Sequence, residues 1–156
     1  MTENVRPTME VTVLAVVEKL TFMFGEHVVA DEITVNAEPW VSARMEFSGD
    51  VHGSLEVAVP QSLQPEIAAN ILGLETDGEP SPEVLDDALR ELLNVVCGHV
   101  IVALAGNRTD FDLTPPRNAA LALDQVTQML GDPDTTCYLM DDEPLLLNLK
   151  FAQRWP

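Results

Sequence analysis

The segment SPEVLDDALRELLNVVCGHVIVAL, residues 81–104, predicts one long helix whose two faces differ in chemistry. Ser81 supplies a hydroxyl cap, Pro82 suits the first helical position, and Glu83 faces the positive end of the helix dipole. Gly106 stands where the helix is expected to stop. The helix is crowded with apolar residues, which are Val84, Leu85, Leu89, Leu92, Val96 and Val100. An amphipathic helix of this length needs a core to cover its apolar side.

The same helix carries a polar stripe formed by Asp87, Glu91, Asn94 and Gly98. Their offsets of 0, 4, 7 and 11 residues, at about 100° per residue, confine them to a stripe about 60° wide. An acid, a second acid, an amide and a glycine therefore line up on one face. Short polar groups that end in a position without a side chain suit a surface that approaches another molecule closely.

Composition narrows the class of protein. The 156 residues suit a single domain, 1–156, and the 46% hydrophobic share against 22% charged is typical of a globular protein. A net charge of −18 argues against binding nucleic acid or an anionic membrane surface. The charge would attract a basic partner, or it simply keeps the protein soluble.

Cysteine usage and the N-terminal region indicate a cytoplasmic protein. Cys97 and Cys137 are too few for a disulfide framework, and Cys97 is interpreted as a buried free thiol. The apolar run VTVLAVVEKLTFMFG (11–25) is interrupted by Glu18 and Lys19 and lacks a basic flank. It is also too short to span a bilayer, so no membrane insertion is expected.

Before the long helix, the sequence predicts another helix and a β-hairpin. Apolar residues recur with helical spacing from about Met9 to Phe24, and Gly25 stands where this helix would stop. The stretches WVSARMEFSG (40–49) and GSLEVAVP (53–60) alternate in hydrophobicity around the loop GDVHG. A short helix is expected in SLQPEIAANILG (62–73), followed by an acidic loop, ETDGEPSP (75–82).

After the long helix, FDLTPP (111–116) predicts a short extended piece, and LALDQVTQML (121–130) fits a strand or a helix. TCYLM (136–140) and LLLNLKF (145–151) predict a hairpin around the turn DDEP. The acids of this turn, Asp141, Asp142 and Glu143, are interpreted as solvated. No histidine or second acidic group is placed nearby to complete a metal site.

A weak internal repeat relates the two long helices. Leu14, Glu18, Thr21 and Gly25 stand at the same offsets as the polar stripe, and each helix is later followed by an antiparallel strand pair. This order predicts a duplicated helix–strand–strand unit with a pseudo-twofold axis.

The stripe and its surroundings resemble the CheC/CheX/FliY family of chemotaxis phosphatases, whose signature is Asp or Ser, then Glu, Asn and Gly at these intervals. A single intact motif at this length is closest to CheX. The resemblance spans nearly the whole chain and implies an α+β fold, with two long helices packed on an antiparallel sheet. It also implies a homodimer, in which apolar C-terminal strands that would otherwise be bare sheet edges are buried.

The resemblance further implies a phosphatase that hydrolyses the aspartyl phosphate of a CheY-like response-regulator receiver domain. Asn94 would orient the attacking water and Glu91 would pair with a receiver lysine, so these two are the expected catalytic residues. Asp87 and Gly98 would contact the partner. The Mg²⁺ of the reaction would belong to the receiver, so no metal ligand and no cofactor is expected in this chain.

Other functions fit parts of the sequence. A non-catalytic binding module or adaptor would use the same helix face to hold a receiver domain or the flagellar motor switch. A purely structural acidic scaffold would show no preference for phosphorylated receivers. An enzyme acting on small molecules is disfavoured, because His27, His52 and His99 have no visible Ser or Cys partner motif. Leu14 and Thr21 replace the acid and the amide in the first helix, so only one working site is expected.

Overall fold

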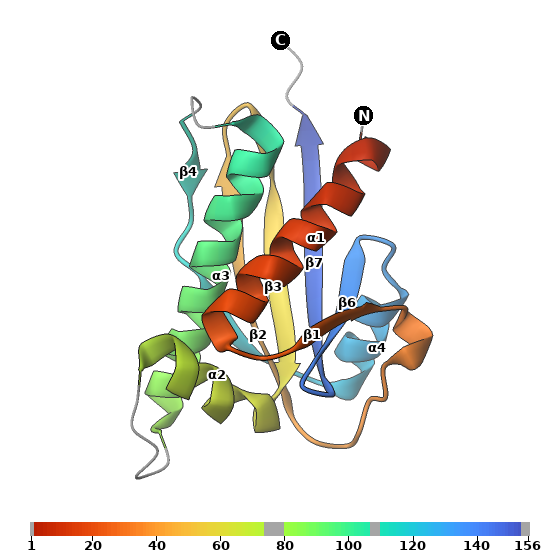
Figure 1. The fold of residues 1–156 in the computed structure, drawn as a ribbon, viewed down its shortest axis with the longest axis vertical. Coiled ribbons are helices and arrows are strands. Elements are labelled where there is room, and N and C mark those ends of the chain that lie inside the picture. The colour runs from red at the N-terminus through yellow and green to blue at the C-terminus, as the bar shows by residue number, and fades with distance from the viewer. Residues whose placement is uncertain (1, 74–79, 107–109, 154–156) are drawn as a thin grey trace.

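The computed structural model describes residues 2–73, 80–106 and 110–153. Four α-helices pack on a seven-stranded antiparallel sheet (Figure 1). The helices are α1 (Thr2–Thr21), α2 (Gln64–Leu72), α3 (Pro82–Ala105) and α4 (Leu123–Gly131). The strands are β1 (Gly25–Val28), β2 (Trp40–Ser48), β3 (Val51–Pro60), β4 (Asp112–Leu113), β5 (Arg117–Leu121), β6 (Thr135–Met140) and β7 (Glu143–Gln153). Two short 3-10 turns cover Ala30–Glu32 and Gln61–Leu63.

The sheet runs in the order β1-β6-β7-β3-β2-β4, and β5 also pairs with β2. Both predicted hairpins are present: Trp40 pairs with Pro60 in one, and Met140 pairs with Glu143 in the other. The two hairpins meet at the centre of the sheet, where β3 and β7 pair from Val51↔Gln153 to Ala58↔Leu146.

The strand order agrees with the predicted duplication. The first half of the chain contributes α1, β1, β2 and β3, and the second half contributes α3, β4, β5, β6 and β7. β1 crosses over to pair with β6 of the second half, while β4 and β5 cross over to pair with β2 of the first. A pseudo-twofold axis between β3 and β7 therefore relates the two halves.

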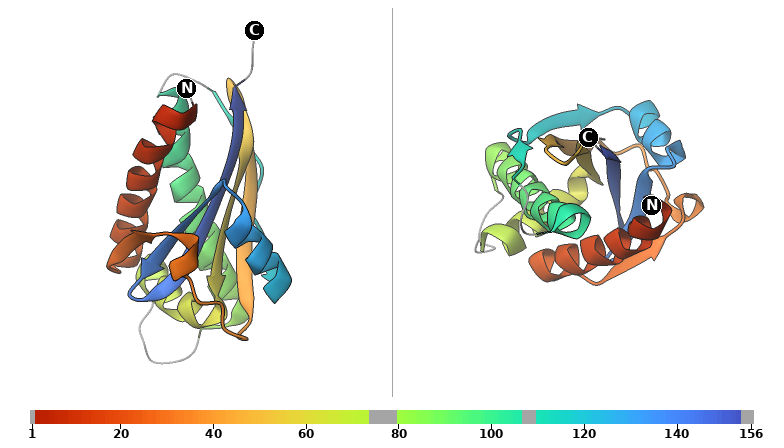
Figure 2. Two further views of the ribbon diagram at one scale, coloured as in Figure 1. Left: turned by 90° about the vertical axis from the view of Figure 1, so that its right-hand side faces the viewer. Right: turned by 90° about the horizontal axis from the view of Figure 1, so that it is seen from above.

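The two long helices cover one face of the sheet, side by side (Figures 1 and 2). Alternate strand residues such as Met45, Leu55 and Leu147 point toward them and form the main core with Val13, Val17, Leu89, Leu92 and Val96. On length and composition alone α3 could cross a membrane. In this fold its apolar side lies on the sheet, which is the arrangement expected of a core helix.

The opposite face of the sheet is covered at one end by α4 (Figure 2). Val126 and Met129, three residues apart, are buried in a second cluster with Trp40, Cys137 and Leu146. This contact explains why the ambiguous segment 121–130 is mainly helical, since a helix places residues three apart on one side.

Several elements differ from the sequence prediction. α1 begins at Thr2 and ends at Thr21, whereas the apolar periodicity suggested Met9 to Phe24. The short strands β1 and β5 were not predicted. β6 and β7 are not bare edges, because β1 pairs with β6 and β3 pairs with β7. Most of the predicted acidic loop, residues 75–82, lies outside the described residues.

Both cysteines are free and buried. Burial raises the pKa of the Cys97 thiol to about 11 and raises that of Cys137 as well. Neither thiol therefore has the thiolate character that nucleophilic or metal-binding chemistry requires, and the interpretation of Cys97 as a buried free thiol is confirmed.

Candidate functional site

The helix that carries the polar stripe is held at both ends by local chemistry. The Ser81 hydroxyl accepts a hydrogen bond from the backbone N–H of Val84 at 3.3 Å, and Pro82 begins the helix. Gly106 ends the helix with a φ of 78°, and its N–H donates to the carbonyl of Val102 at 2.8 Å. The start and the end are those that the sequence predicts.

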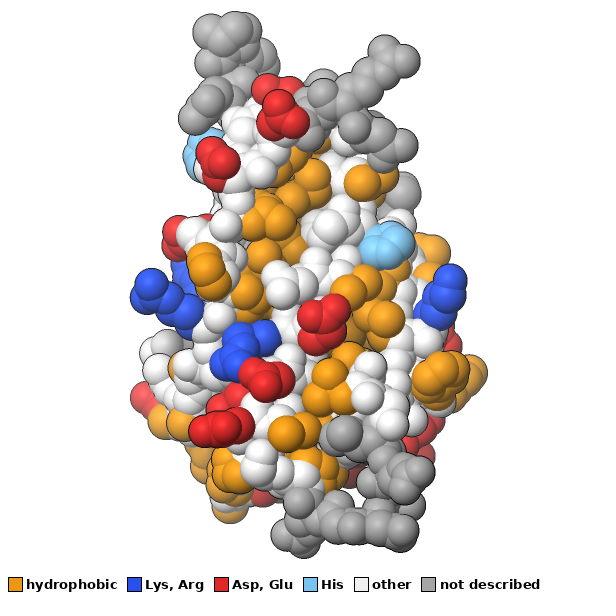
Figure 3. Space-filling view, turned by 90° about the vertical axis from the view of Figure 1, so that its left-hand side faces the viewer, with side chains coloured by type: hydrophobic (Ala, Val, Ile, Leu, Met, Phe, Trp, Pro, Cys, Tyr) orange, Lys and Arg blue, Asp and Glu red, His pale blue; other side chains and the backbone are white. Residues whose placement is uncertain are grey.

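The side chains of α3 divide into a buried arc and an exposed arc. The buried residues are Ala88, Leu89, Leu92, Leu93, Val96, Cys97, Val100 and Ile101. Asp87, Glu91, Asn94 and Gly98 are all exposed and lie on the opposite side of the helix. Figure 3 looks onto the side of the molecule that carries this helix, where a few charged side chains stand among hydrophobic and neutral ones. The whole stripe is thus open to a partner.

Gly98 has no role in the packing of this chain. A Cβ atom added at Gly98 would have no neighbour within 4 Å. At Gly53, by contrast, an added Cβ would lie 1.9 Å from the carbonyl oxygen of Lys150, so the sheet itself requires that glycine. A glycine in the interior of a helix costs about 1 kcal/mol of stability relative to alanine. The packing of this chain therefore does not explain the glycine at this position.

Asp87 takes part in a polar network that anchors the stripe to the sheet. Its carboxylate forms an ion pair with Arg90, one helical turn further on. Arg90 Nη1 also donates to Asn118 Oδ1 on β5 at 2.5 Å, and Asn118 Nδ2 donates to the carbonyl of Asp86 at 3.3 Å. Arg90 therefore neutralises Asp87 and fixes the side of α3 that faces β5.

Glu91 and Asn94 are left available by this network. Arg90 is the sequence neighbour of Glu91 but points to Asp87, because adjacent residues on a helix diverge by about 100°. Neither Glu91 nor Asn94 has a side-chain hydrogen bond or ion pair with any residue in the described ranges. The stripe presents one unpaired carboxylate and one unpaired carboxamide to solvent, which suit ion pairing and the orientation of a water molecule.

The corresponding positions on α1 are used for packing instead. Thr21 is only 1% exposed, and its hydroxyl donates to the carbonyl of Val17 at 2.7 Å. Glu18 Oε2 accepts the N–H of Gly25 at 3.3 Å, and a Cβ added at Gly25 would lie 2.5 Å from Leu14 Cδ1. These four residues tie α1 to β1 and leave no open polar stripe.

The structure adds two residues, Arg90 and Asn118, to the polar network beside the stripe, and the sequence analysis did not predict their contacts. The Asp87–Arg90 spacing of three residues is a signal for an ion pair that could have been found in the sequence. Asn118 gives no such signal, because it lies 28 residues from Arg90 on a strand that was not predicted. Within the described residues, no group of three or more His, Cys, Asp or Glu side chains could hold a metal ion.

A groove of about 640 Å³ elsewhere in the molecule does not belong to this site. It lies at the uncovered end of the opposite sheet face and is lined by both apolar and charged residues, among them Phe47, Arg44, Glu46 and Lys150. Lys150 is paired with Asp132 at 2.7 Å, and Arg44 lies 3.7 Å from Glu46. The cations of this groove are therefore already matched within the chain.

Comparison with known families places these features in context. Residues 41–139 match the family model described as "Chemotaxis phosphatase CheX". A comparison with curated protein sequences finds no significant match. The predicted family resemblance is therefore confirmed by the family model.

Solved structures agree on the fold. A CheX–CheY–BeF3–Mg²⁺ complex from Borrelia burgdorferi is 15% identical with a TM-score of 0.65, over 93% of this chain and 96% of that chain. CheX from Vibrio vulnificus is 18% identical with a TM-score of 0.67, over 92% and 93%. CheX from Desulfovibrio desulfuricans is 12% identical with a TM-score of 0.67, over 96% and 99%. At these identities the likeness establishes the α+β fold and leaves the activity to be argued from the site.

Proposed function

Because the chain belongs to the CheX family of chemotaxis phosphatases, we propose that it removes the phosphoryl group from the phosphorylated aspartate of a CheY-like receiver domain. The observation that carries the proposal is the open stripe on α3, in which Glu91 and Asn94 are exposed and Gly98 serves no packing purpose. The Borrelia burgdorferi relative, which is a CheX, forms a complex with CheY in the presence of BeF3 and Mg²⁺. A receiver domain is the corresponding partner for this chain.

Asn94 orients the water that attacks the phosphorus atom. Hydrolysis of an acyl phosphate needs an in-line water and neutralised charge more than it needs covalent chemistry. A carboxamide accepts one hydrogen bond from water and donates another, without adding negative charge beside the phosphoryl group. As the water oxygen bonds to phosphorus, the bond from phosphorus to the aspartyl oxygen breaks. The aspartate leaves as a carboxylate, and the water proton goes to the phosphate product or to solvent.

Glu91 anchors the helix on the receiver. An unpaired carboxylate close to a phosphoryl group would be repelled, so its role requires a cation from the partner, and a receiver lysine supplies one. The Mg²⁺ that neutralises the phosphoryl oxygens belongs to the receiver as well. On this proposal the chain holds no cofactor of its own.

Asp87 and Gly98 define the two ends of the contact. Because Arg90 already pairs with Asp87, this end of the stripe offers the receiver a neutral polar pair. At the other end Gly98 lets the receiver backbone lie against the helix. Glu91 is then the one stripe residue whose charge is left for the partner to match.

The test is the rate of phosphate release from phosphorylated receiver domains, measured for a panel of receivers with and without the protein. Acceleration of at least one receiver supports the phosphatase. Tight binding of phosphorylated receivers without acceleration would establish the non-catalytic adaptor instead, and absence of both would refute a receiver partner. A cytoplasmic location is part of the proposal, because receiver domains act there.

The proposed homodimer needs a different edge from the strands first considered. The ladder between β6 and β7 ends at Thr135↔Asn148, although β7 continues to Gln153. Among the described strands, this last part of β7 pairs with β3 alone. A second copy could continue the sheet there. Light scattering that shows a monomer at micromolar concentration would rule the dimer out.

A further inference from the structure

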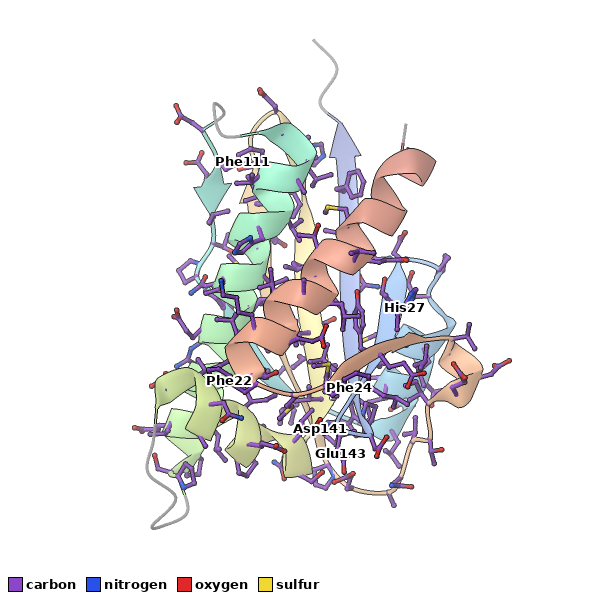
Figure 4. All side chains as sticks on the ribbon, in the orientation of Figure 1. Phe22, Phe24, His27, Phe111, Asp141 and Glu143 are labelled. Carbon is purple, nitrogen blue, oxygen red and sulfur yellow. The ribbon has the colours of Figure 1, made fainter. Side chains whose placement is uncertain are left out.

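Two phenylalanine side chains stand in solvent where α1 gives way to β1. Phe22 is 78% exposed and Phe24 is 73% exposed, whereas Met23 between them is 3% exposed and belongs to the main core. We call residues 22–24 the aromatic knuckle. Figure 4 shows Phe22 and Phe24 near the end of α1, with Asp141 and Glu143 below Phe24. Scattered exposed apolar residues are normal, but here two large aromatic side chains are exposed within three residues of the chain.

The backbone holds the aromatic knuckle in one conformation. Asp141 Oδ1 accepts the N–H of Phe24 at 2.9 Å, and the N–H of Asp141 donates to the carbonyl of Phe24 at 2.8 Å. The N–H of Phe22 donates to the carbonyl of Glu18 at 2.9 Å, which closes the last turn of α1. With Met23 in the core, the two rings are displayed on a fixed support rather than on a loose loop, which lowers the entropy cost of binding.

Phe22 adopts a backbone conformation that costs stability. Its φ is 55°, in the left-handed region that a bulky side chain rarely occupies and that glycine enters freely. Strained conformations of this kind persist where the surroundings enforce them and are concentrated at functional sites. A glycine would be the stabilising choice at this position, so folding alone does not account for the phenylalanine.

The surroundings of the aromatic knuckle define the chemistry of its partner. Val11 is 70% exposed and lies with the exposed Ala15 on one side of α1, which adds apolar surface to the helix that leads to the knuckle. The charged residues next to the knuckle in sequence or in strand register are Glu18, Glu26, Asp141, Asp142 and Glu143, against a single Lys19.

We propose that the aromatic knuckle docks a basic amphipathic helical segment of a partner protein. The apolar side of such a segment would cover the phenylalanine rings, and its lysines and arginines would meet the acidic rim and the aromatic faces. A second copy that met this one knuckle to knuckle would place the same acidic rim residues against one another, so it does not fit here. An anionic membrane surface is repelled for the same reason.

The test uses a labelled peptide of about 15 residues with leucines on one helical face and lysines on the other. Fluorescence anisotropy with the full chain is expected to show saturable binding that weakens as salt is added. A Phe22→Ser/Phe24→Ser double variant is expected to bind about 20-fold more weakly or worse. Leu123→Ser is the matched control, since Leu123 is 42% exposed on α4. This control is expected to bind like wild type.

Two further variants separate docking from a structural role. Asp141→Asn keeps the oxygen that accepts the Phe24 N–H but removes one rim charge, so affinity is expected to fall modestly and to depend less on salt. Phe22→Gly relieves the left-handed strain, so the melting temperature is expected to rise while peptide affinity falls. A fall in both the melting temperature and the peptide affinity would show that Phe22 has a structural role, and it would overturn the proposal.

Other outcomes would also overturn it. These are no saturable binding, equal binding of wild type and the double serine variant, or equal binding of a leucine–glutamate peptide. Association of wild type with anionic phospholipid vesicles but not with the peptide would make the patch a membrane contact. Slower receiver dephosphorylation by a well-folded double serine variant would assign the patch to the receiver interface.

Discussion

α1 and α3 lie side by side on one face of the sheet, and each is associated with four residues at the offsets 0, 4, 7 and 11. The two sets of residues nevertheless have different environments. On α3 the stripe lies on the solvent side and continues through a helix that runs to Ala105. On α1 Thr21 and Leu14 turn toward the protein, and the helix ends at Thr21. Duplication of the fold has therefore not duplicated the exposed stripe. Residues at these spacings can contact a partner only where their face of the helix is exposed to solvent.

The largest expected difference between the two helices comes from Asn94→Ala. Loss of the water-orienting carboxamide should slow phosphate release by about 100-fold or more, while receiver binding stays near the wild-type value. The free energy of unfolding should change by no more than about 0.5 kcal/mol, because Asn94 is exposed. Single-turnover phosphate release and receiver titration measure the two effects separately. Wild-type rates in this variant would refute the assignment.

Glu91→Ala should act on binding more than on chemistry. Removing the anchor leaves a receiver lysine without its partner, so KM should rise about 30-fold with a smaller change in kcat. The change in stability should again stay within about 0.5 kcal/mol, since Glu91 is exposed. Steady-state kinetics with one phosphorylated receiver distinguish the two parameters. A loss confined to kcat would instead place Glu91 in the chemical step.

Gly98 and Gly25 occupy the last position of the two sets of residues, and alanine substitutions at these two positions are expected to have opposite effects. Gly98→Ala should stabilise the protein by about 1 kcal/mol, because the new methyl group has open space in this chain. It should also raise KM about fivefold, because the methyl group would meet the receiver. Gly25→Ala should cost about 1 kcal/mol and leave KM unchanged, because Leu14 and Met140 must move. Thermal unfolding with receiver kinetics checks both. Equal effects of the two substitutions would contradict the comparison.

Thr21→Ala should have the smallest effect on activity, within about twofold of wild type. Its hydroxyl is buried and bonded to Val17, so the cost falls on stability, at about 1 kcal/mol. Thr21→Asn should not create a second site, because the position is 1% exposed and a longer polar side chain would have to be accommodated in the core. A well-folded Thr21→Ala protein with a large loss of phosphate release would show that α1 acts directly.

Local sequence signals predicted the parts of the fold that local chemistry controls. Ser81, Pro82 and Gly106 fix the limits of α3 through its own backbone groups, and the alternating residues of β2 and β3 suffice to define a hairpin. The exposed placement of Glu91 and Asn94 follows from helical periodicity alone. These features were predicted because each depends on residues that are close in the chain.

The features that were missed depend on distant residues. The segment RNAAL forms β5 only through its pairing with β2, so nothing in its own pattern predicts a strand. The bond from Arg90 to Asn118 depends on that strand. The apolar periodicity of α1 continues through Phe24, but the helix ends at Thr21. Phe22 turns into the left-handed region, and Phe24 forms hydrogen bonds with Asp141, 117 residues away.

The crossed strands have a consequence for how the chain reaches this structure. β7, the last strand of the sheet in chain order, stands at its centre between β3 and β6. Ribosomal synthesis delivers β1 to β3 first, but β1 finds no partner strand until β6 has been made. The first half is therefore an incomplete sheet with an open strand, exposed to mispairing until translation of β7. Folding should be slow and all-or-none, and fragments that end before Glu143 should be captured by chaperones or degraded.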